Sequence, residues 1–336
     1  MGFQLTRVQL NDFLAALREE YVLCAPRRYR GGGAFSDTDC VRYGEVRSAD
    51  EIEFAEKAAY SFKEVLLPVS QTLFYFAEGE TREADGPKKG VVVFLRSCDL
   101  HAVRRLDAIY LHNGPADYYY SRLRDRIKWV VLGCEHSFDT CFCVSMGTNK
   151  PEGYDMSLDW AGDSCLADCR DAEWAAMLTK AQVPALPVTP RFVTENAVQV
   201  HVPENLSAAV AQSDLWAEYT ARCINCGRCN FVCPTCTCFT MQDLYYSENF
   251  RAGERRRVWA SCMADGFTDV AGGGSYRKAN GDRMRFKVLH KVLDFKQRNG
   301  FQMCVGCGRC DAICPEYISF SHCINRLDAA MKEVSQ

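Results

Sequence analysis

Two cysteine runs contain the residues of this sequence whose types and spacing best suit chemistry. Residues 223–234 read CINCGRCNFVCP, and residues 304–315 read CVGCGRCDAICP. Both follow the spacing C-x2-C-x2-C-x3-C and end in proline, the pattern with which bacterial ferredoxins bind 4Fe-4S clusters. Three neighbouring thiolates of such a run bind one cluster, and the fourth thiolate binds the other cluster. The repeated pattern therefore predicts two 4Fe-4S clusters.

The crossing of the fourth cysteine divides the eight thiols into two predicted ligand sets. The first set is Cys223, Cys226, Cys229 and Cys314, and the second is Cys304, Cys307, Cys310 and Cys233. The alternative is a zinc-stabilised scaffold, since zinc is also bound by cysteines at C-x2-C spacing. Triplets that are followed by Cys-Pro and occur twice favour iron and sulfur over zinc.

Composition narrows the class of protein. The chain has 336 residues, 20 cysteines and a formal net charge of −3. So small a net charge predicts no nucleic-acid partner. The sequence shows no secretion signal and no apolar run long enough to cross a membrane, so we expect a cytoplasmic protein without a membrane span. In that compartment thiols stay reduced and available as metal ligands.

The first part of the chain has the pattern of an α/β domain. The run Gly90–Leu95 is continuously apolar and β-branched, as in a buried parallel strand, and Ile127–Leu132 repeats it. Helical spacing between them, at 101–111, completes a strand–helix–strand unit. We predict an α/β domain with a short parallel sheet over residues 1–205, and a helical, two-cluster ferredoxin-like domain over residues 206–336.

Local patterns predict further elements. Helices are expected at 48–59, 171–182, 241–250, 284–298 and 322–334, and strands at 191–194 and 197–202.

A third group of cysteines follows the two predicted strands. Cys98 and Cys134 each come just after a strand, and Cys141 and Cys143 follow shortly. Open α/β sheets bind ligands at the carboxyl ends of their strands, so these four thiols form a proposed third 4Fe-4S site. Asp99, His101 or His136 could replace one cysteine. The alternative is that these are free cysteines packed as small hydrophobic residues.

The other eight cysteines receive no ligand role: Cys24, Cys40, Cys165, Cys169, Cys236, Cys238, Cys262 and Cys323. We expect Cys236 and Cys238 to pack beside a cluster or to donate hydrogen bonds to it. No dinucleotide fingerprint and no catalytic constellation stands out, so we expect no catalytic residues and no cofactor beyond the clusters.

Four segments together resemble a known family. RSCDLHAV, GCEHSFDTCFCVSMGT, CINCGRCNFVCPTCTCF and FQMCVGCGRCDAICPEYIS resemble the A subunits of anaerobic sulfite reductases. They are also similar, more distantly, to the β subunits of sulfhydrogenase-type nickel–iron hydrogenases.

The resemblance implies a non-catalytic electron-transfer subunit with clusters at all three cysteine groups. Its expected partners are a flavoprotein (FAD/NADH) subunit that supplies electrons and a sirohaem subunit that reduces sulfite to sulfide. The alternative is the electron-transfer β subunit of a nickel–iron hydrogenase.

Overall fold

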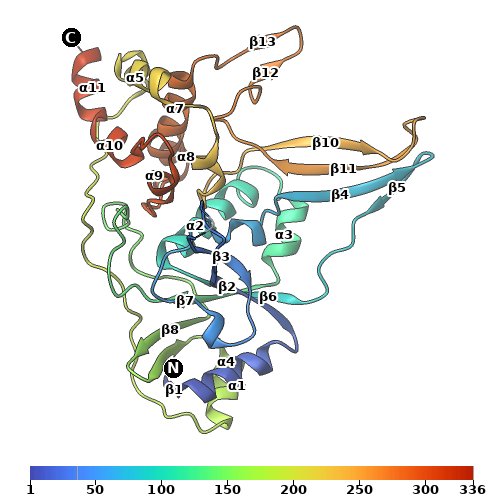
Figure 1. Ribbon diagram of the computed structural model, residues 1–336, viewed down its shortest axis with the longest axis vertical. Helices are drawn as coiled ribbons and strands as arrows, with labels where there is room; N and C mark the ends of the chain where they lie inside the picture. Colours follow the sequence, from blue (N-terminus) through green and yellow to red (C-terminus); the bar gives the residue numbers. More distant parts are fainter. Residues whose placement is uncertain (36, 336) are drawn as a thin grey trace.

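The computed structural model describes residues 1–35 and 37–335. Ser36 and Gln336, which fall within the two predicted domains, lie outside the described residues. A sheet of seven strands forms the centre of the N-terminal part, with the order β1-β9-β8-β7-β6-β2-β3 (Figure 1). Its strands are β1 (Gly2–Thr6), β2 (Tyr21–Tyr29), β3 (Cys40–Glu45), β6 (Gly90–Leu95), β7 (Ile127–Leu132), β8 (Met156–Ala161) and β9 (Ser164–Cys169).

The predicted parallel sheet is confirmed at its centre but is larger and mixed. β2, β6, β7 and β8 run parallel, whereas β1, β9 and β3 pair antiparallel at the edges. Continuous apolar runs predicted β6 and β7, because both faces of these strands are covered. β8 and β9 were missed because β8 carries a buried Asp159 and β9 (SCLADC) has none of the β-branched or aromatic residues typical of strands.

Helices cover both faces of this sheet. On one face, α1 (Arg7–Leu17) and α4 (Ala172–Lys180) pack against alternate residues such as Val92 and Phe94. On the other face, α2 (Ser97–Tyr110) and α3 (Tyr118–Arg124) pack against Val93 and Leu95. The expected helix at 171–182 is thus confirmed as α4. The residues that follow β6 and β7 therefore lie at the carboxyl edge of the sheet.

The second part of the chain is not wholly helical. β10 (Phe239–Tyr245) and β11 (Ala252–Trp259) form a hairpin that joins β4 (Ser70–Ala77) and β5 (Glu80–Glu83) in a four-stranded sheet. This sheet projects sideways from the body and joins segments on both sides of residue 205 (Figure 1). The helix expected at 241–250 is therefore wrong. The backbone hydrogen bonds that pair β10 with β11 override the helical spacing of this segment.

Helices gather at the C-terminal end of the molecule, opposite α1 and α4 (Figure 1). They are η3 (Ala208–Gln212), α5 (Leu215–Arg222), α6 (Arg228–Phe231), α7 (Asn280–Leu289), π-helix η4 (His290–Asp294), α8 (Phe295–Asn299), α9 (Arg309–Ile313), α10 (Phe320–Asn325) and α11 (Leu327–Val334). A small hairpin, β12 (Asp269–Val270) and β13 (Gly274–Ser275), precedes α7. The helices expected at 284–298 and 322–334 are confirmed, each in more than one piece.

Two other local predictions are wrong. Residues 48–59 contain only the short η1 (Ala49–Glu51), and residues 191–202 form no strand. Both segments are mostly irregular, because tertiary packing overrides their local helical and strand patterns. A second short helix, η2 (Phe62–Val65), follows η1. Among the described residues, no helix combines the length and the apolar character needed to cross a membrane.

Phe62 anchors the 46–69 segment to the sheet, so its truncation should destabilise the fold. The ring is fully buried and packs edge-on against Trp129 and Tyr43, with centroids 5.8 and 6.5 Å away. We expect Phe62→Ala to lower the free energy of unfolding by about 3–5 kcal/mol in urea titrations. Val8→Ala, on the exposed face of α1, should change it by less than about 0.5 kcal/mol. Equal effects would contradict this packing.

Candidate metal centres

The first predicted ligand set lines one cavity. Cys223 caps α5, and Gly227 in the left-handed conformation begins α6. The cavity holds about 540 Å³, open solvent included, and its thiols are those of Cys223, Cys226, Cys229, Cys310 and Cys314. Burial raises the pKa of Cys223, and the neighbouring sulfurs of Cys229, Cys226 and Cys314 add to the rise. Cys314, distant in sequence, therefore lies where the crossing pattern predicts.

The second predicted set gathers around Cys233. Cys304 and Cys307 lie in the loop before α9, and Cys310 lies in its first turn. Burial raises the pKa of all three thiols, that of Cys304 to about 12, and the negative charge of Cys233 contributes to each rise.

The first set also receives backbone hydrogen bonds. The N–H groups of Asn225 and Ile318 donate to Cys223 Sγ and Cys314 Sγ, at 3.5 and 3.4 Å.

The third predicted set is brought together in part. Cys134, Cys141 and Cys143 lie near one another. Burial raises the pKa of Cys143 to about 12, and the negative charges of Cys141 and Cys134 add to the rise. Cys98 is buried at the start of α2, and its sulfur neighbours are those of Cys307 and Cys143. The fourth thiol thus lies between this group and the second set.

The possible substitutes for a cysteine have other partners. The ring of His101 is hydrogen-bonded to the carbonyl oxygen of Lys150 at 2.8 Å. His136 lies edge-on to Phe138, with ring centroids 5.4 Å apart, although it lines a cavity together with Cys134. Asp99 forms a buried ion pair. Neither His101 nor Asp99 is free to replace a thiolate.

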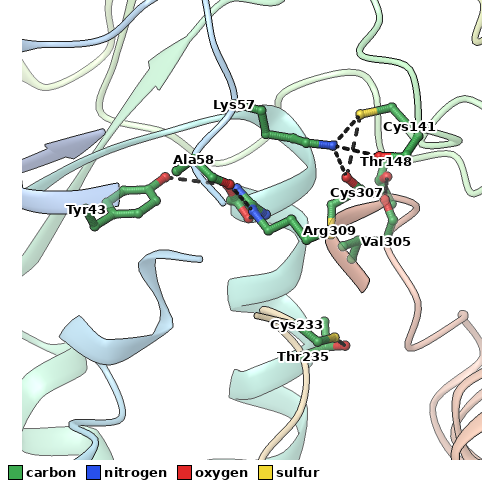
Figure 2. Close-up of polar contacts among 12 residues, drawn as sticks. Tyr43, Lys57, Ala58, Cys141, Thr148, Cys233, Thr235, Val305, Cys307 and Arg309 are labelled. Atoms are coloured by element: carbon green, nitrogen blue, oxygen red, sulfur yellow. Dashed lines mark hydrogen bonds and ion pairs between the residues drawn. The ribbon is translucent and has the colours of Figure 1, made fainter. Parts of the chain in front are cut away.

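A buried ion pair connects the third group to the second. Arg309 donates two hydrogen bonds to Asp99, 2.6 and 2.7 Å long, and both side chains are at most 1% exposed. A third donor, Arg309 Nε, binds the carbonyl oxygen of Ala58 at 2.9 Å. Figure 2 shows Arg309 reaching from the second cysteine motif toward Tyr43 and Ala58. The pair joins the start of α2 to the start of α9.

The loops of the two groups also touch directly. Phe142 N donates to Gly306 O at 2.8 Å, and Thr148 Oγ1 donates to Val305 O at 2.6 Å. Gly306 and Gly308 have φ of +64° and +67°, and a Cβ there would lie 2.5 and 2.0 Å from carbonyl oxygens of the 140–142 segment. Only glycine permits both this conformation and this approach.

Lys57 binds across the same contact. Its Nζ donates to Cys141 Sγ at 3.3 Å and to Cys307 O at 2.7 Å (Figure 2). These two hydrogen bonds join the third cysteine group to the second. No sequence pattern indicates this contact, because Lys57 lies 84 residues from Cys141 along the chain.

Three buried lysines surround the C-terminal thiols. Lys63, Lys287 and Lys291 are each 3% exposed, and among the described residues none forms an ion pair with a carboxylate. Burial lowers the pKa of Lys287 while the sulfurs of Cys229 and Cys310 raise it, and the sulfurs prevail. Lys291 Nζ lies 3.4 Å from Cys233 Sγ.

The charges of these buried lysines indicate whether 4Fe-4S clusters suit the cysteine groups. A buried cation without a partner is strongly unfavourable, so an anion is expected beside it. A cluster with four thiolates supplies negative charge at that place. In the part of the chain that the structure describes, no three His, Cys, Asp or Glu side chains are arranged to hold one metal ion. A cubane binds each thiolate at a different iron, so its ligands need not converge on a point. The residues fit the clusters.

Comparison with known proteins agrees with this geometry. Residues 222–318 match the family described as 4Fe-4S dicluster domain. The sulfhydrogenase 2 subunit beta of Pyrococcus furiosus is 32% identical over 294 residues, which cover 82% of this chain and 86% of that protein. The chain belongs to the sulfhydrogenase subunit beta family. As predicted, it carries 4Fe-4S clusters. No solved structure matches the chain.

This membership corrects the main functional prediction. The relay from an NADH-linked flavoprotein to a sirohaem subunit, inferred from the resemblance to sulfite reductase A subunits, is wrong, and the hydrogenase alternative is favoured. The segments that carried the resemblance explain the error. The RSCD and TCFC segments meet the second motif inside the protein, so they carry no information about the final electron acceptor.

Breaking the buried ion pair should be costly. We expect Asp99→Asn to lower the free energy of unfolding by about 3–5 kcal/mol, because Arg309 keeps its charge without a partner. Asp50→Asn, which breaks an exposed ion pair with Arg7, should cost less than about 1 kcal/mol. The measurement is anaerobic urea unfolding of both variants. A cost for Asp99→Asn as small as that for Asp50→Asn would contradict the role given to the pair.

Proposed function

We propose that this chain is the electron-transfer β subunit of a sulfhydrogenase-type nickel–iron hydrogenase complex. The observation that carries the proposal is the relationship to a sulfhydrogenase subunit over most of both chains. When bound, 4Fe-4S clusters supply one-electron transfer. The part of this chain is to hold the clusters, to order them in space and to set their electrostatic surroundings.

The placement of the thiols supports a linear order of three sites. The third group meets the second through Cys98, whose sulfur neighbours Cys307, and through Cys141 Sγ, 3.6 Å from Cys307 O. The second set meets the first where α9 packs on α6, and Lys287 has sulfurs of both sets, Cys229 and Cys310, as neighbours. We infer that electrons pass in this order or its reverse.

The two C-terminal sites differ in their surroundings. The second set is enclosed, with Lys291 and Lys57 near it, whereas Cys226 of the first set is exposed. Exposure, charge and hydrogen bonds to sulfur set the reduction potential of such sites. We propose that the exposed first site faces a partner subunit, because Ile224 and Tyr317 beside it are 56% and 87% exposed.

A native purification tests the proposed function. The tagged chain is purified anaerobically from the cells that make it, and the retained proteins are assayed for nickel and for sirohaem. We expect a nickel-containing subunit in stoichiometric amount and reduction of the bound clusters by hydrogen gas. A complex that contains sirohaem without nickel, or clusters that hydrogen fails to reduce, would refute the proposal.

Iron content tests the ligand sets. We expect about twelve irons and as many acid-labile sulfides per chain, four for each of three cubanes. Cys98→Ala should lower the count toward about eight, because the third site loses a ligand. Cys40→Ala is the matched control, since Cys40 is a half-buried thiol of β3 outside all three sets, and its iron content should not change. Eight irons in the unaltered chain would remove the third site.

A further inference from the structure

Three thiols outside the ligand sets lie beside the second one. Cys236 and Cys238 follow Cys233 in the chain, and Cys262 approaches from beyond β11. The hydroxyl of Thr235 lies 3.3 Å from Cys233 Sγ and receives a hydrogen bond from Lys291 at 2.9 Å. The side chain of Cys236 is hydrogen-bonded to Cys233, a predicted ligand. Cys238 and Cys262 therefore remain as a separate pair.

The hairpin of β10 and β11 brings this pair into contact. Phe239 at the start of β10 pairs with Trp259 at the end of β11, and Ala260 N donates to Cys238 O at 2.9 Å. Cys238 precedes the first strand and Cys262 follows the second, so both lie at the open end of the hairpin. Their side chains are therefore neighbours, and each affects the pKa of the other. A disulfide requires this kind of proximity between two thiols.

The surroundings of Cys262 favour a reactive sulfur. Asn230 Nδ2 donates a hydrogen bond to Cys262 Sγ at 3.0 Å. The hydrogen bond from Cys238 is the main cause that lowers the pKa of Cys262 to about 6, and Asn230 and the ammonium groups of Lys287 and Lys291 act in the same direction. A thiolate beside a thiol is the arrangement from which disulfide exchange begins.

Cys238 is partly exposed, unlike the buried Cys262. It lines a narrow surface pocket together with Cys236, Tyr110, Arg257 and Trp259. The other closely spaced pair, Cys165 and Cys169 on β9, is fully buried, and these thiols donate to the backbone oxygens of Leu166 and Asp171 rather than to each other. Packing as small hydrophobic residues explains the β9 pair. Such packing does not explain why Cys238 and Cys262 are neighbours, why Asn230 donates a hydrogen bond to Cys262, or why Cys238 lines a surface pocket.

We propose that Cys238 and Cys262 form a redox-active dithiol that is reversibly oxidised to a disulfide beside the second cluster site. From the Cys262 thiolate and the Cys238 thiol, oxidation forms one S–S bond, breaks the S–H bond of Cys238 and releases two electrons and one proton. The proton leaves at the pocket beside Cys238. The electron acceptors are two of the 4Fe-4S clusters of this family, one electron each, and reduction is the reverse. The pair would couple two-electron chemistry to a one-electron relay, and only this choice of acceptor rests on the proposed function.

Thiol mapping of the unaltered, cluster-loaded chain is the first test. The anaerobic protein is treated with the thiol oxidant diamide or with dithiothreitol, and free thiols are alkylated under denaturing conditions before mass spectrometry. We expect one disulfide, between Cys238 and Cys262, after diamide, and alkylation of both Cys238 and Cys262 after dithiothreitol. Cys165 and Cys169 should be alkylated in both samples. Alkylation of Cys238 and Cys262 in both samples, or a different bridge, would overturn the proposal.

Electron counting is the second test, and it separates the pair from the clusters. After mild oxidation, the unaltered chain should take up two more electrons per chain in a dithionite titration than Cys262→Ser does. Cys165→Ser is the matched control and should behave as the unaltered chain. Equal uptake by Cys262→Ser and the unaltered chain would overturn the dithiol while leaving the relay intact. Loss of iron in Cys262→Ser would also overturn it, since Cys262 would then be a cluster ligand.

Discussion

The buried ion pair between Asp99 and Arg309 is the contact on which the arrangement of the metal sites depends. Asp99 stands at the carboxyl edge of the central sheet, and Arg309 stands within the second cysteine motif. Both charges are removed from water, so neither partner can leave without exposing the other to a large desolvation cost. The pair therefore fixes the third cysteine group against the second. The close approach of Gly306 and Gly308 to the 140–142 segment follows from the same contact.

Charge balance extends this constraint through the C-terminal part. Lys287 and Lys291 are buried among cysteines whose sulfurs raise their pKa, so their positive charge faces thiolates instead of carboxylates. This arrangement is favourable only when negative charge is held nearby, as it is by thiolate-bound 4Fe-4S clusters. Binding of the clusters and correct folding of this part should therefore be coupled, as in other metal-dependent domains.

Sequence patterns predicted those features whose cause is local. The spacing of Cys223, Cys226 and Cys229 fits one loop around one cluster, and the apolar run Gly90–Leu95 fits a strand that is covered on both faces. The patterns failed where partners are distant in the chain. The segment 241–250 forms a strand and not a helix because β11 pairs with it, and β11 is itself paired with β4. The electron acceptor was also predicted wrongly, because cysteine motifs that hold clusters are shared by electron carriers with different acceptors.

The sequence by itself determined that this protein carries 4Fe-4S clusters, since a ligand loop is a local structure, and it predicts eight thiols for two of them. Only the tertiary structure decided that Cys98 faces Cys307, that three buried lysines surround the sulfurs, and that Cys238 meets Cys262. These contacts join residues brought together by the sheet edge and by the hairpin. Their energies come from burial and charge in the folded interior, and no short sequence pattern records them.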